Sequence, residues 1–213
     1  MLVISLLTVA TIITFLYLKP NQMEKIESTK NLDTVSYENL PFLGSQDAPV
    51  KIVEFADFKC PGCKAWSQKY LPKMKKDYID TGKVQLFFVN YPIINESDTA
   101  ALVGKSIYKQ SNSAFWKYYE MVYKNQKSET ENWATPTFLF NLVERENLGI
   151  NLEKLKTNVE QKTYASDVQE DINLAKKAGV HSTPTIFIQG KEVAPFDYTK
   201  IQQRIDQEFS RQR

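Results

Sequence analysis

The two cysteines of this 213-residue chain lie close together, in the sequence Cys60-Pro61-Gly62-Cys63. A disulfide between them closes so short a loop that it removes little entropy from the unfolded chain. A zinc site needs about four ligands, and the single histidine, His181, lies far along the chain. The spacing therefore predicts a redox pair that alternates between dithiol and disulfide, and no metal site is expected.

The segments on either side of the pair predict a strand and a helix. Residues 49–58 are apolar and rich in β-branched side chains, and apolar residues recur at helical spacing over 64–80. A cysteine at the start of a helix lies beside unpaired backbone N–H groups and the positive end of the helix dipole, and both favour its thiolate. We therefore predict Cys60 as the exposed nucleophile and Cys63, one turn into the helix, as the shielded resolving thiol.

A second candidate element is the sequence HSTPT at residues 181–185, just before a predicted strand. A proline that enters a buried strand cannot donate to the sheet. One interpretation is that Pro184 stands at the first position of the strand, where proline is tolerated. The other is a cis-proline loop packed against the cysteine pair, with the backbone of Thr183 paired to a bound client chain. The residues favour neither interpretation over the other.

The first half of the globular part predicts a parallel strand–helix–strand unit. Its elements are the strand over 49–58, the helix over 64–80 with a kink at Pro72, and a second strand over 84–91. The cysteine pair stands at the first turn of this unit.

The remaining elements complete the fold class. Four or five helical patterns and no strand pattern occur from 98 to 180. A hairpin of strands at 185–189 and 191–194 follows, and then an amphipathic helix. This order predicts an α/β protein, with a thioredoxin-type sheet interrupted by an inserted all-helical domain. The expected units are the first half of the thioredoxin fold over 46–94, the helical insertion over 95–180 and the second half over 181–213.

The first residues, 1–18, contain no charged side chain and predict a short transmembrane helix. A cleaved signal peptide is the alternative, but the residues at 15–19 are too large for a cleavage site. An uncleaved anchor is therefore favoured, followed by a polar linker over 19–45.

Two signals conflict on the orientation of this anchor. Lys19 and Lys25 follow the apolar run and no basic residue precedes it, which by the positive-inside rule places the globular part in the cytoplasm. A redox-active disulfide fits an oxidising compartment instead. We give the redox chemistry more weight and expect a single-pass protein of the cell membrane, with its catalytic domain on the extracytoplasmic side.

The charges of the chain argue against nucleic acid as a partner. The 27 basic and 25 acidic residues nearly cancel and form no block of like charge. The hydrophobic content of 42% is sufficient for a globular core. We expect a monomer with no cofactor other than the disulfide between Cys60 and Cys63.

Three stretches of sequence carry a resemblance to a known family: VEFADFKCPGCK at 53–64, FWKYYEMVYKNQ at 115–126 and GVHSTPTIFI at 179–188. They resemble the DsbA family, and within it the Gram-positive BdbD-type branch, in order and from about Leu40 to the end. The resemblance implies a thioredoxin fold with a helical insertion and oxidase activity towards exported, reduced or unfolded proteins. It also implies reoxidation by a quinone-linked, DsbB-like oxidoreductase of the membrane.

The same resemblance implies roles for individual residues. It places the nucleophile at Cys60, the resolving thiol at Cys63, and a cis-proline at Pro184 with Thr183 before it. Glu54 falls where relatives carry a buried acid that moves protons during exchange, although a surface-facing glutamate is the alternative. The client-binding residues expected on this basis are Thr183, Pro184, Pro61 and Gly62.

The chain departs from some relatives in two ways. The strand over 84–90 contains no lysine to pair with Glu54, and Asp57 and Lys59 are interpreted as charges at the rim of the site. Gly62 stands where better-known oxidases carry a histidine, and it offers no side-chain donor or charge to the Cys60 thiolate.

The effect of Gly62 can be put in magnitudes. Thiol pKa values are near 7 in thioredoxin and about 3.5 in DsbA, and one pKa unit is worth about 1.36 kcal/mol. This difference supplies on the order of 90 mV of the ~150 mV between their potentials. A Cys60 thiol with a pKa near 6 would therefore lack most of the oxidising advantage of DsbA.

Two other functions use the same scaffold. A reductase or isomerase differs from an oxidase only in its potential and its membrane partner. A chaperone-like module would hold unfolded chains on the surface around Pro184 without chemistry. Replacing Cys60 by serine abolishes either enzyme activity but spares simple binding, which separates these classes.

Overall fold

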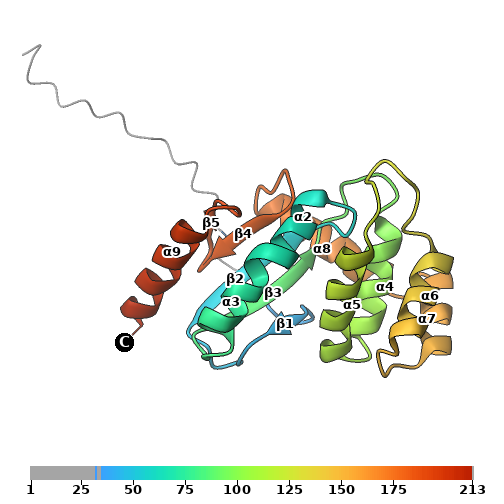
Figure 1. Ribbon diagram of the computed structural model, residues 1–213, viewed down its shortest axis with the longest axis horizontal. Coiled ribbons are helices and arrows are strands. Elements are labelled where there is room, and N and C mark those ends of the chain that lie inside the picture. The colour runs from blue at the N-terminus through green and yellow to red at the C-terminus, as the bar shows by residue number, and fades with distance from the viewer. Residues whose placement is uncertain (1–31, 33–34, 213) are drawn as a thin grey trace, which may run out of the picture.

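The computed structural model describes residue 32 and residues 35–212 (Figure 1). The predicted membrane anchor over 1–18 lies outside these residues, as does most of the predicted linker. Among the residues described, no helix is long and apolar enough to cross a membrane.

A five-stranded sheet in the order β1-β3-β2-β4-β5 forms the centre of the fold. Its parallel pair is β2 with β3, and the other neighbours are antiparallel. The predicted strand–helix–strand unit and the predicted C-terminal hairpin are both present. The strands are β1 (Phe42–Leu43), β2 (Val50–Ala56), β3 (Val84–Asn90), β4 (Thr185–Ile188) and β5 (Lys191–Val193).

The helical segment after the cysteine pair runs from Pro61 to Ile79 and alternates between two helix types. It consists of α2 (Pro61–Ala65), the π-helical η1 (Trp66–Tyr70), α3 (Leu71–Met74) and the π-helical η2 (Lys75–Ile79). Pro72 has no N–H to donate, and it stands in the short α3 between the two π-helical segments. The kink expected at Pro72 is therefore part of a longer irregularity, which wider helical turns accommodate.

Five helices follow β3, and one more closes the fold. They are α4 (Asp98–Tyr108), α5 (Asn112–Asn125), α6 (Pro136–Glu146), α7 (Leu152–Glu160), α8 (Ala165–Lys177) and α9 (Tyr198–Arg211). Side chains cap several of them as the sequence predicts: Thr135 accepts a hydrogen bond from the N–H of Phe138, and Asn151 accepts one from the N–H of Lys154. Helices α4 to α7 gather beside one edge of the sheet in Figure 1.

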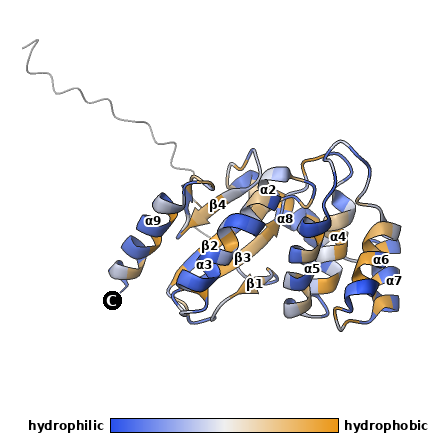
Figure 2. Ribbon diagram, in the orientation of Figure 1, coloured by the Kyte–Doolittle hydropathy of each residue, from blue (hydrophilic) through white to orange (hydrophobic). Residues whose placement is uncertain are grey.

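The two faces of the sheet are covered by different helices. On one face α2, α3 and α9 pack on the sheet, and α9 turns its apolar side inwards and its hydrophilic side outwards (Figure 2). On the other face the side chains of Ala175 and Ala178, at the end of α8, pack against Phe55 and Phe187. Successive residues of a strand point to opposite faces, so Glu54 lies on the face of α2 and α3.

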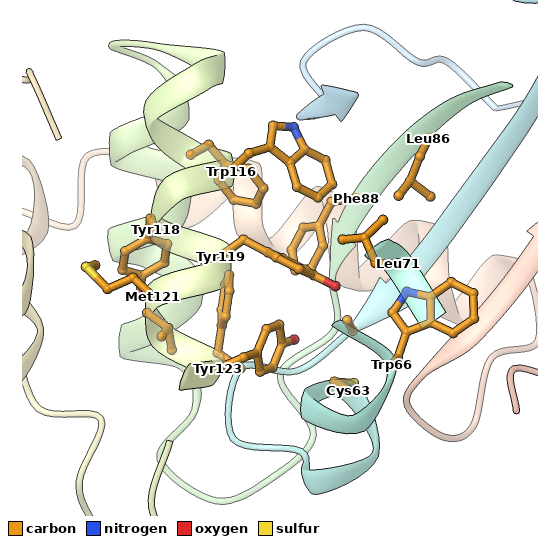
Figure 3. Close-up of a cluster of buried hydrophobic side chains, with 14 of the residues drawn as sticks. Cys63, Trp66, Leu71, Leu86, Phe88, Trp116, Tyr118, Tyr119, Met121 and Tyr123 are labelled. Atoms are coloured by element: carbon orange, nitrogen blue, oxygen red, sulfur yellow. The ribbon is translucent and has the colours of Figure 1, made fainter. Parts of the chain in front are cut away.

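The helical insertion shares its core with the thioredoxin half. The ring of Phe58, just after β2, contacts the rings of Tyr118, Tyr119 and Tyr123 on α5 at centroid distances of 5.2 to 6.4 Å. Figure 3 shows two of them, Tyr119 and Tyr123, pointing from α5 towards the helix that carries Cys63. One continuous hydrophobic cluster joins the two halves, so the insertion forms one wall of the site.

Part of the predicted linker belongs to this fold. The ring of Tyr37 stacks on Phe87 at 4.3 Å, and Leu40 is only 4% exposed. Phe42 starts β1, and its carbonyl accepts hydrogen bonds from Asn112 and Trp116 at 2.8 and 2.7 Å. The linker boundary at residue 45 is therefore wrong, because aromatic side chains from residue 37 onwards cover the edge of the sheet.

A buried ion pair connects the insertion to the sheet. Lys105 of α4 places its Nζ 2.9 Å from Oδ2 of Asp171 on α8, and both side chains are at most 5% exposed. Asp171 also accepts hydrogen bonds from the backbone and the side-chain amide of Asn90, at the end of β3. Three elements therefore meet at one carboxylate.

Candidate active site

Cys60 is the N-cap residue of α2, with extended backbone, and Pro61 occupies the first helical turn. Pro61 costs no hydrogen bond there, because the first N–H groups of a helix lack intrahelical partners. Cys60 is only 8% exposed and Cys63 is fully buried. The shielded position predicted for Cys63 is confirmed, whereas the exposed position predicted for Cys60 is wrong: the cis-proline loop and α2 cover most of it.

The environment of Cys60 favours its thiolate and lowers the pKa of the thiol to about 6. The largest cause is a hydrogen bond from the Cys63 thiol, and donors on Thr183 and the backbone N–H groups of Cys63 and Gly62 add to it. Burial acts in the opposite direction but is smaller than these hydrogen bonds together. Cys60 is therefore mostly ionised at neutral pH, although Gly62 contributes no side chain.

The Cys63 thiol has the opposite property. Burial raises its pKa well above the ordinary value, and the neighbouring charges of Cys60 and Glu54 raise it further. A thiolate and a thiol therefore share one proton across a hydrogen bond, and the two titrate as a pair. This division suits thiol–disulfide exchange, which needs a reactive outer sulfur and a protected inner one.

The loop before β4 packs directly on the pair. The Thr183–Pro184 peptide bond is cis, and the carbonyl oxygen of Thr183 lies 3.2 Å from Sγ of Cys60. A Cβ atom on Gly62 would meet Cδ of Pro184 at 3.0 Å. Of the two interpretations of Pro184, the structure has the cis-proline loop against the cysteine pair.

Glu54 lies in the middle of β2 and is fully buried, so the surface-facing alternative is wrong. Its two carboxylate oxygens accept hydrogen bonds from the hydroxyl of Tyr119, at 3.0 and 3.1 Å. Burial raises the pKa of Glu54 to about 8, and Tyr119 and then Trp66 act against this rise. The position expected for a proton-carrying acid is thus occupied, with a tyrosine as its partner where no lysine is present.

Asp57 and Lys59 are buried too, and each is 1% exposed, which corrects their interpretation as rim charges. Asp57 accepts hydrogen bonds from the N–H groups of Ile93 and Ile94 and from the hydroxyl of Ser97. Lys59 donates to the carbonyl of Asn95 at 2.7 Å. These contacts fix the loop that leads into Cys60.

Sequence reasoning missed three contributors from α5 and its end. Tyr119 holds Glu54, Tyr123 donates to the carbonyl of Asp57 at 3.2 Å, and Gln126 donates to the carbonyls of Phe58 and Cys60. The aromatic stripe over 115–123 predicted a core-facing helix, and that is confirmed. A stripe pattern does not show which hydroxyls reach across to another element.

An apolar surface adjoins the pair, and it was also missed. Phe196, in the loop after β5, is 50% exposed, and a Cβ atom on Gly62 would lie 3.5 Å from its ring. The ring of Tyr70 lies 5.8 Å from that of Phe196, and the Tyr70 hydroxyl donates to the Phe196 carbonyl. The absence of a side chain at Gly62 leaves room for this aromatic pair beside Cys60.

The site brings two sulfur atoms together. Among the described residues, no group of three or more His, Cys, Asp or Glu side chains could hold a metal ion. The redox-active group is the Cys60–Cys63 pair, which is present in its reduced state with no disulfide.

Comparisons with known proteins agree with this geometry. The sequence model of a family described as thioredoxin matches residues 36–207. The chain is 39% identical to the probable disulfide bond formation protein D of Bacillus anthracis over 183 residues, which are 85% of this chain and 84% of that protein. It is 37% identical to the disulfide bond formation protein D of Bacillus subtilis, over 82% of this chain and 79% of that protein.

Solved structures show the same similarity. The crystal structure of oxidised BdbD from Bacillus subtilis superposes with a TM-score of 0.78 at 36% identity, over 82% of this chain and 95% of that one. DsbA from Chlamydia trachomatis shares the fold, with a TM-score of 0.72 at 24% identity, over 82% of this chain and 93% of that one.

Proposed function

Because this chain belongs to the thioredoxin family, in its DsbA-like and BdbD-like branch of thiol:disulfide oxidoreductases, we propose that it introduces disulfides into exported proteins. The observation that carries the proposal is the division of the pair. Cys60 is held as a thiolate with a pKa of about 6, and Cys63 beneath it is fully buried and held as a thiol. The lowered pKa of Cys60 stabilises the reduced pair and so favours donation of the disulfide, by part of the margin that separates DsbA from thioredoxin.

The exchange runs through a mixed disulfide. A client thiolate attacks Sγ of Cys60, the Cys60–Cys63 bond breaks, and Cys63 leaves as a thiolate that takes up a proton. A second client thiolate then attacks the client sulfur in the mixed disulfide, and Cys60 leaves as a stabilised thiolate. The client gains one disulfide, and the enzyme keeps two electrons and is left as the dithiol.

Reoxidation requires a disulfide donor from outside the chain. We propose that a quinone-linked, DsbB-like oxidoreductase of the membrane removes these two electrons. The names of the relatives, disulfide bond formation proteins, support a net oxidising direction. A donor in the membrane would suit a catalytic domain tethered there.

Client chains would bind across the cis-proline loop. The backbone of Thr183 lies beside Sγ of Cys60 and can pair with an extended client strand. Pro184, Pro61 and Gly62 border the same surface, and the half-exposed ring of Phe196 adds apolar area for unfolded chains. This surface accepts many sequences, because backbone pairing and apolar contact do not depend on a single side chain.

The redox potential tests the oxidising direction. The protein lacking its first 31 residues is equilibrated with glutathione buffers, and the free thiols are counted after alkylation. The Cys60 thiolate, about one pKa unit below that of thioredoxin, accounts for a rise of about 30 mV above −270 mV. We expect a value at or above about −240 mV. A value near −270 mV would contradict the oxidase and favour a reductase.

The location of the catalytic domain is proposed separately, on the extracytoplasmic side of the cell membrane and anchored by residues 1–18. Its support is the apolar sequence of that segment and the need for an oxidising compartment. A membrane-impermeant maleimide applied to intact cells after mild reduction should label Cys60. Labelling only after the cells are lysed would place the domain in the cytoplasm.

A further inference from the structure

The hydroxyl of Tyr119 lies at a buried acidic side chain, Glu54, beneath the cysteine pair. It donates to both oxygens of Glu54, at 3.0 and 3.1 Å, and both residues are fully buried. Tyr119 belongs to α5 in the helical insertion, whereas Glu54 belongs to β2 of the thioredoxin half. Figure 3 shows the Tyr119 and Tyr123 hydroxyls pointing from α5 towards the helix that carries Cys63 and Trp66.

Among the residues that the structure describes, the groups that face Glu54 include no basic side chain. From α2 it faces the Cys63 thiol, and from α5 it faces Tyr119 and Tyr123. Trp66, at the start of η1, offers an indole N–H that makes no hydrogen bond of good geometry. The neighbours across the strands are the apolar Phe88 on β3 and Ile186 on β4. Tyr119 is therefore the main stabilising partner of the carboxylate.

Glu54 in turn acts on Cys63. Its negative charge is one of the causes that raise the pKa of the Cys63 thiol, so the two groups are electrostatically coupled. Every exchange cycle adds a proton to the Cys63 sulfur or removes one. When Cys63 closes the disulfide, its thiol loses a proton, its thiolate attacks Sγ of Cys60, and the group bound to Cys60 leaves with the electron pair.

We propose that Tyr119 is a positioning residue for this proton transfer: it holds the Glu54 carboxylate in place and sets the pH at which Glu54 can take the proton from Cys63. The inference rests on the proposed function as an exchange catalyst. The inference adds that the helical insertion, through the hydroxyl of Tyr119, controls the step performed by the buried Cys63.

The tyrosine remains a donor throughout. Burial raises the pKa of Tyr119 well above its ordinary value, and the charge of Glu54 raises it further, so the hydroxyl keeps its proton over the working pH range. A donor that never ionises favours the charged form of its partner. Removing it therefore raises the pKa of Glu54 and moves proton uptake to higher pH.

The experiment is a stopped-flow reaction of the reduced protein with dithiobis-nitrobenzoate, in which each released thionitrobenzoate is coloured. The first phase reports the attack of Cys60, and the second reports the attack of Cys63 on the mixed disulfide. Both phases are recorded as a function of pH for the unaltered protein and for Tyr119→Phe. Tyr118→Phe is the matched control, since its hydroxyl is equally buried but donates to the carbonyl of Ala100.

In Tyr119→Phe we expect the midpoint of the second phase to move upwards by about one pH unit, because a hydrogen bond to a charged group is lost. At pH values below that midpoint, the variant should release the second thionitrobenzoate up to about tenfold more slowly than the unaltered protein. The first phase should not change, because Tyr119 does not contact Cys60, and it also reports that α2 is intact. Tyr118→Phe should leave both midpoints in place.

Two results would overturn the inference. One is a second-phase midpoint for Tyr119→Phe equal to that of Tyr118→Phe. The other is an equal slowing by Tyr119→Phe in a Glu54→Gln background, which would show that the hydroxyl acts through packing. The assay uses no client protein and runs whichever way electrons flow in the cell. Its failure is therefore separate from failure of the oxidase proposal, which the redox potential decides.

Discussion

The thiolate of Cys60 is stabilised by thiol and backbone donors, and position 62 offers it no side chain. A Cβ atom at Gly62 would meet Cδ of Pro184 at 3.0 Å and Sγ of Cys60 and the Phe196 ring at 3.5 Å each. A side chain there would therefore displace Phe196 or press on Pro184. The same position controls two properties, the stability of the thiolate and the access of an aromatic ring to it.

Gly62→His should make the protein more oxidising. An imidazole beside Cys60 adds a donor and a partial positive charge, which should lower the pKa of the thiol below its value of about 6. A shift of one to two units corresponds to a rise of roughly 30 to 60 mV in potential. Glutathione equilibration measures it. Gly62→Ala, which adds a Cβ without a donor, is the control, and an equal rise there would show that the effect is steric.

Glu54 makes the folded protein sensitive to pH. Burial raises the pKa of Glu54 from 4.5 to about 8, so the folded state binds a proton that the unfolded state has released. This contribution to stability is complete below the unfolded pKa and is lost as the pH rises through the folded pKa. Raising the pH through the folded pKa of Glu54 should therefore lower the free energy of unfolding.

Glu54→Gln removes this dependence. Between about pH 5 and pH 9 the free energy of unfolding of the unaltered protein should fall relative to the variant by on the order of 4 kcal/mol, at about 1.36 kcal/mol per pKa unit. Urea titration at both pH values measures the difference, and the other titrating groups are common to both proteins. A constant difference would mean that Glu54 does not retain its proton.

The roles of single residues could be predicted from the sequence where the signal is local. Cys60, the helix start and Cys63 lie within one short stretch. The residues around Pro184 left two interpretations open, and only the family resemblance pointed to the cis-proline. Tyr119 could not be found in this way, because its contact with Glu54 spans 65 positions and depends on how α5 packs. Buried charges were missed for the same reason: the partners of Asp57 come from the segment after β3.

At the scale of elements, two ion pairs in different environments join α8 to α4 and to Lys109, the residue that follows α4. Lys105 and Asp171 are buried. In the second pair, Nζ of Lys109 lies 2.6 Å from Oδ2 of Asp167, and the two side chains are 24% and 22% exposed. A buried carboxylate that loses its partner is costly, and an exposed pair contributes little. The two pairs therefore form a matched comparison within the same helix interface.

Lys105→Met should lower the free energy of unfolding by roughly 3 to 5 kcal/mol, because it leaves Asp171 buried without its cation. Lys109→Met should cost less than about 1 kcal/mol. Adding Asp171→Asn to Lys105→Met should recover part of the loss, since the amide can still accept from Asn90. Urea unfolding measures all three. Equal costs for the two lysine variants would contradict the role of the buried pair.

The loop between β5 and α9 should contribute to client binding. In Phe196→Ala we expect kcat/KM for a reduced, unfolded client protein to fall by roughly 5- to 30-fold, which corresponds to the loss of about 1 to 2 kcal/mol of apolar contact. The redox potential and the rate with glutathione should not change. A parallel loss with glutathione would show that Phe196 acts on Cys60 and not on clients.

The order of the helices and strands could be predicted from the sequence more easily than the boundaries of the folded part. Strands, helices and the insertion follow from apolar period and caps such as Thr135 and Asn151. The segment before β2 was taken as linker because it is polar on average. Three isolated apolar residues bind this segment to the sheet: Tyr37, Leu40 and Phe42. The mean polarity of the whole segment does not reveal them.

At the scale of the whole molecule, the thioredoxin half and the insertion share one hydrophobic core. The cluster around Phe58 and α5 has no boundary between them. Separate domains with such an interface would each expose large aromatic surfaces. The two parts should therefore unfold together.

Single-tryptophan variants can test this cooperativity. Trp66 lies in the thioredoxin half and Trp133 in the insertion, and both are almost fully buried. Variants with the other two tryptophans changed to Phe should give fluorescence transitions in urea with coincident midpoints, once corrected for the stability of each variant by circular dichroism. Distinct midpoints for fluorescence and circular dichroism would show that the insertion unfolds by itself.

The ends of the sheet have a consequence for a protein that meets unfolded chains. Its outermost strands are short: β1 is two residues long, and β5 is three residues long with exposed Lys191 and Glu192. Long, flat, apolar edges invite other chains to extend a sheet and nucleate aggregates, and short charged edges discourage this. A catalyst built in this way can hold an unfolded client briefly at its sulfur without becoming the template on which that client aggregates.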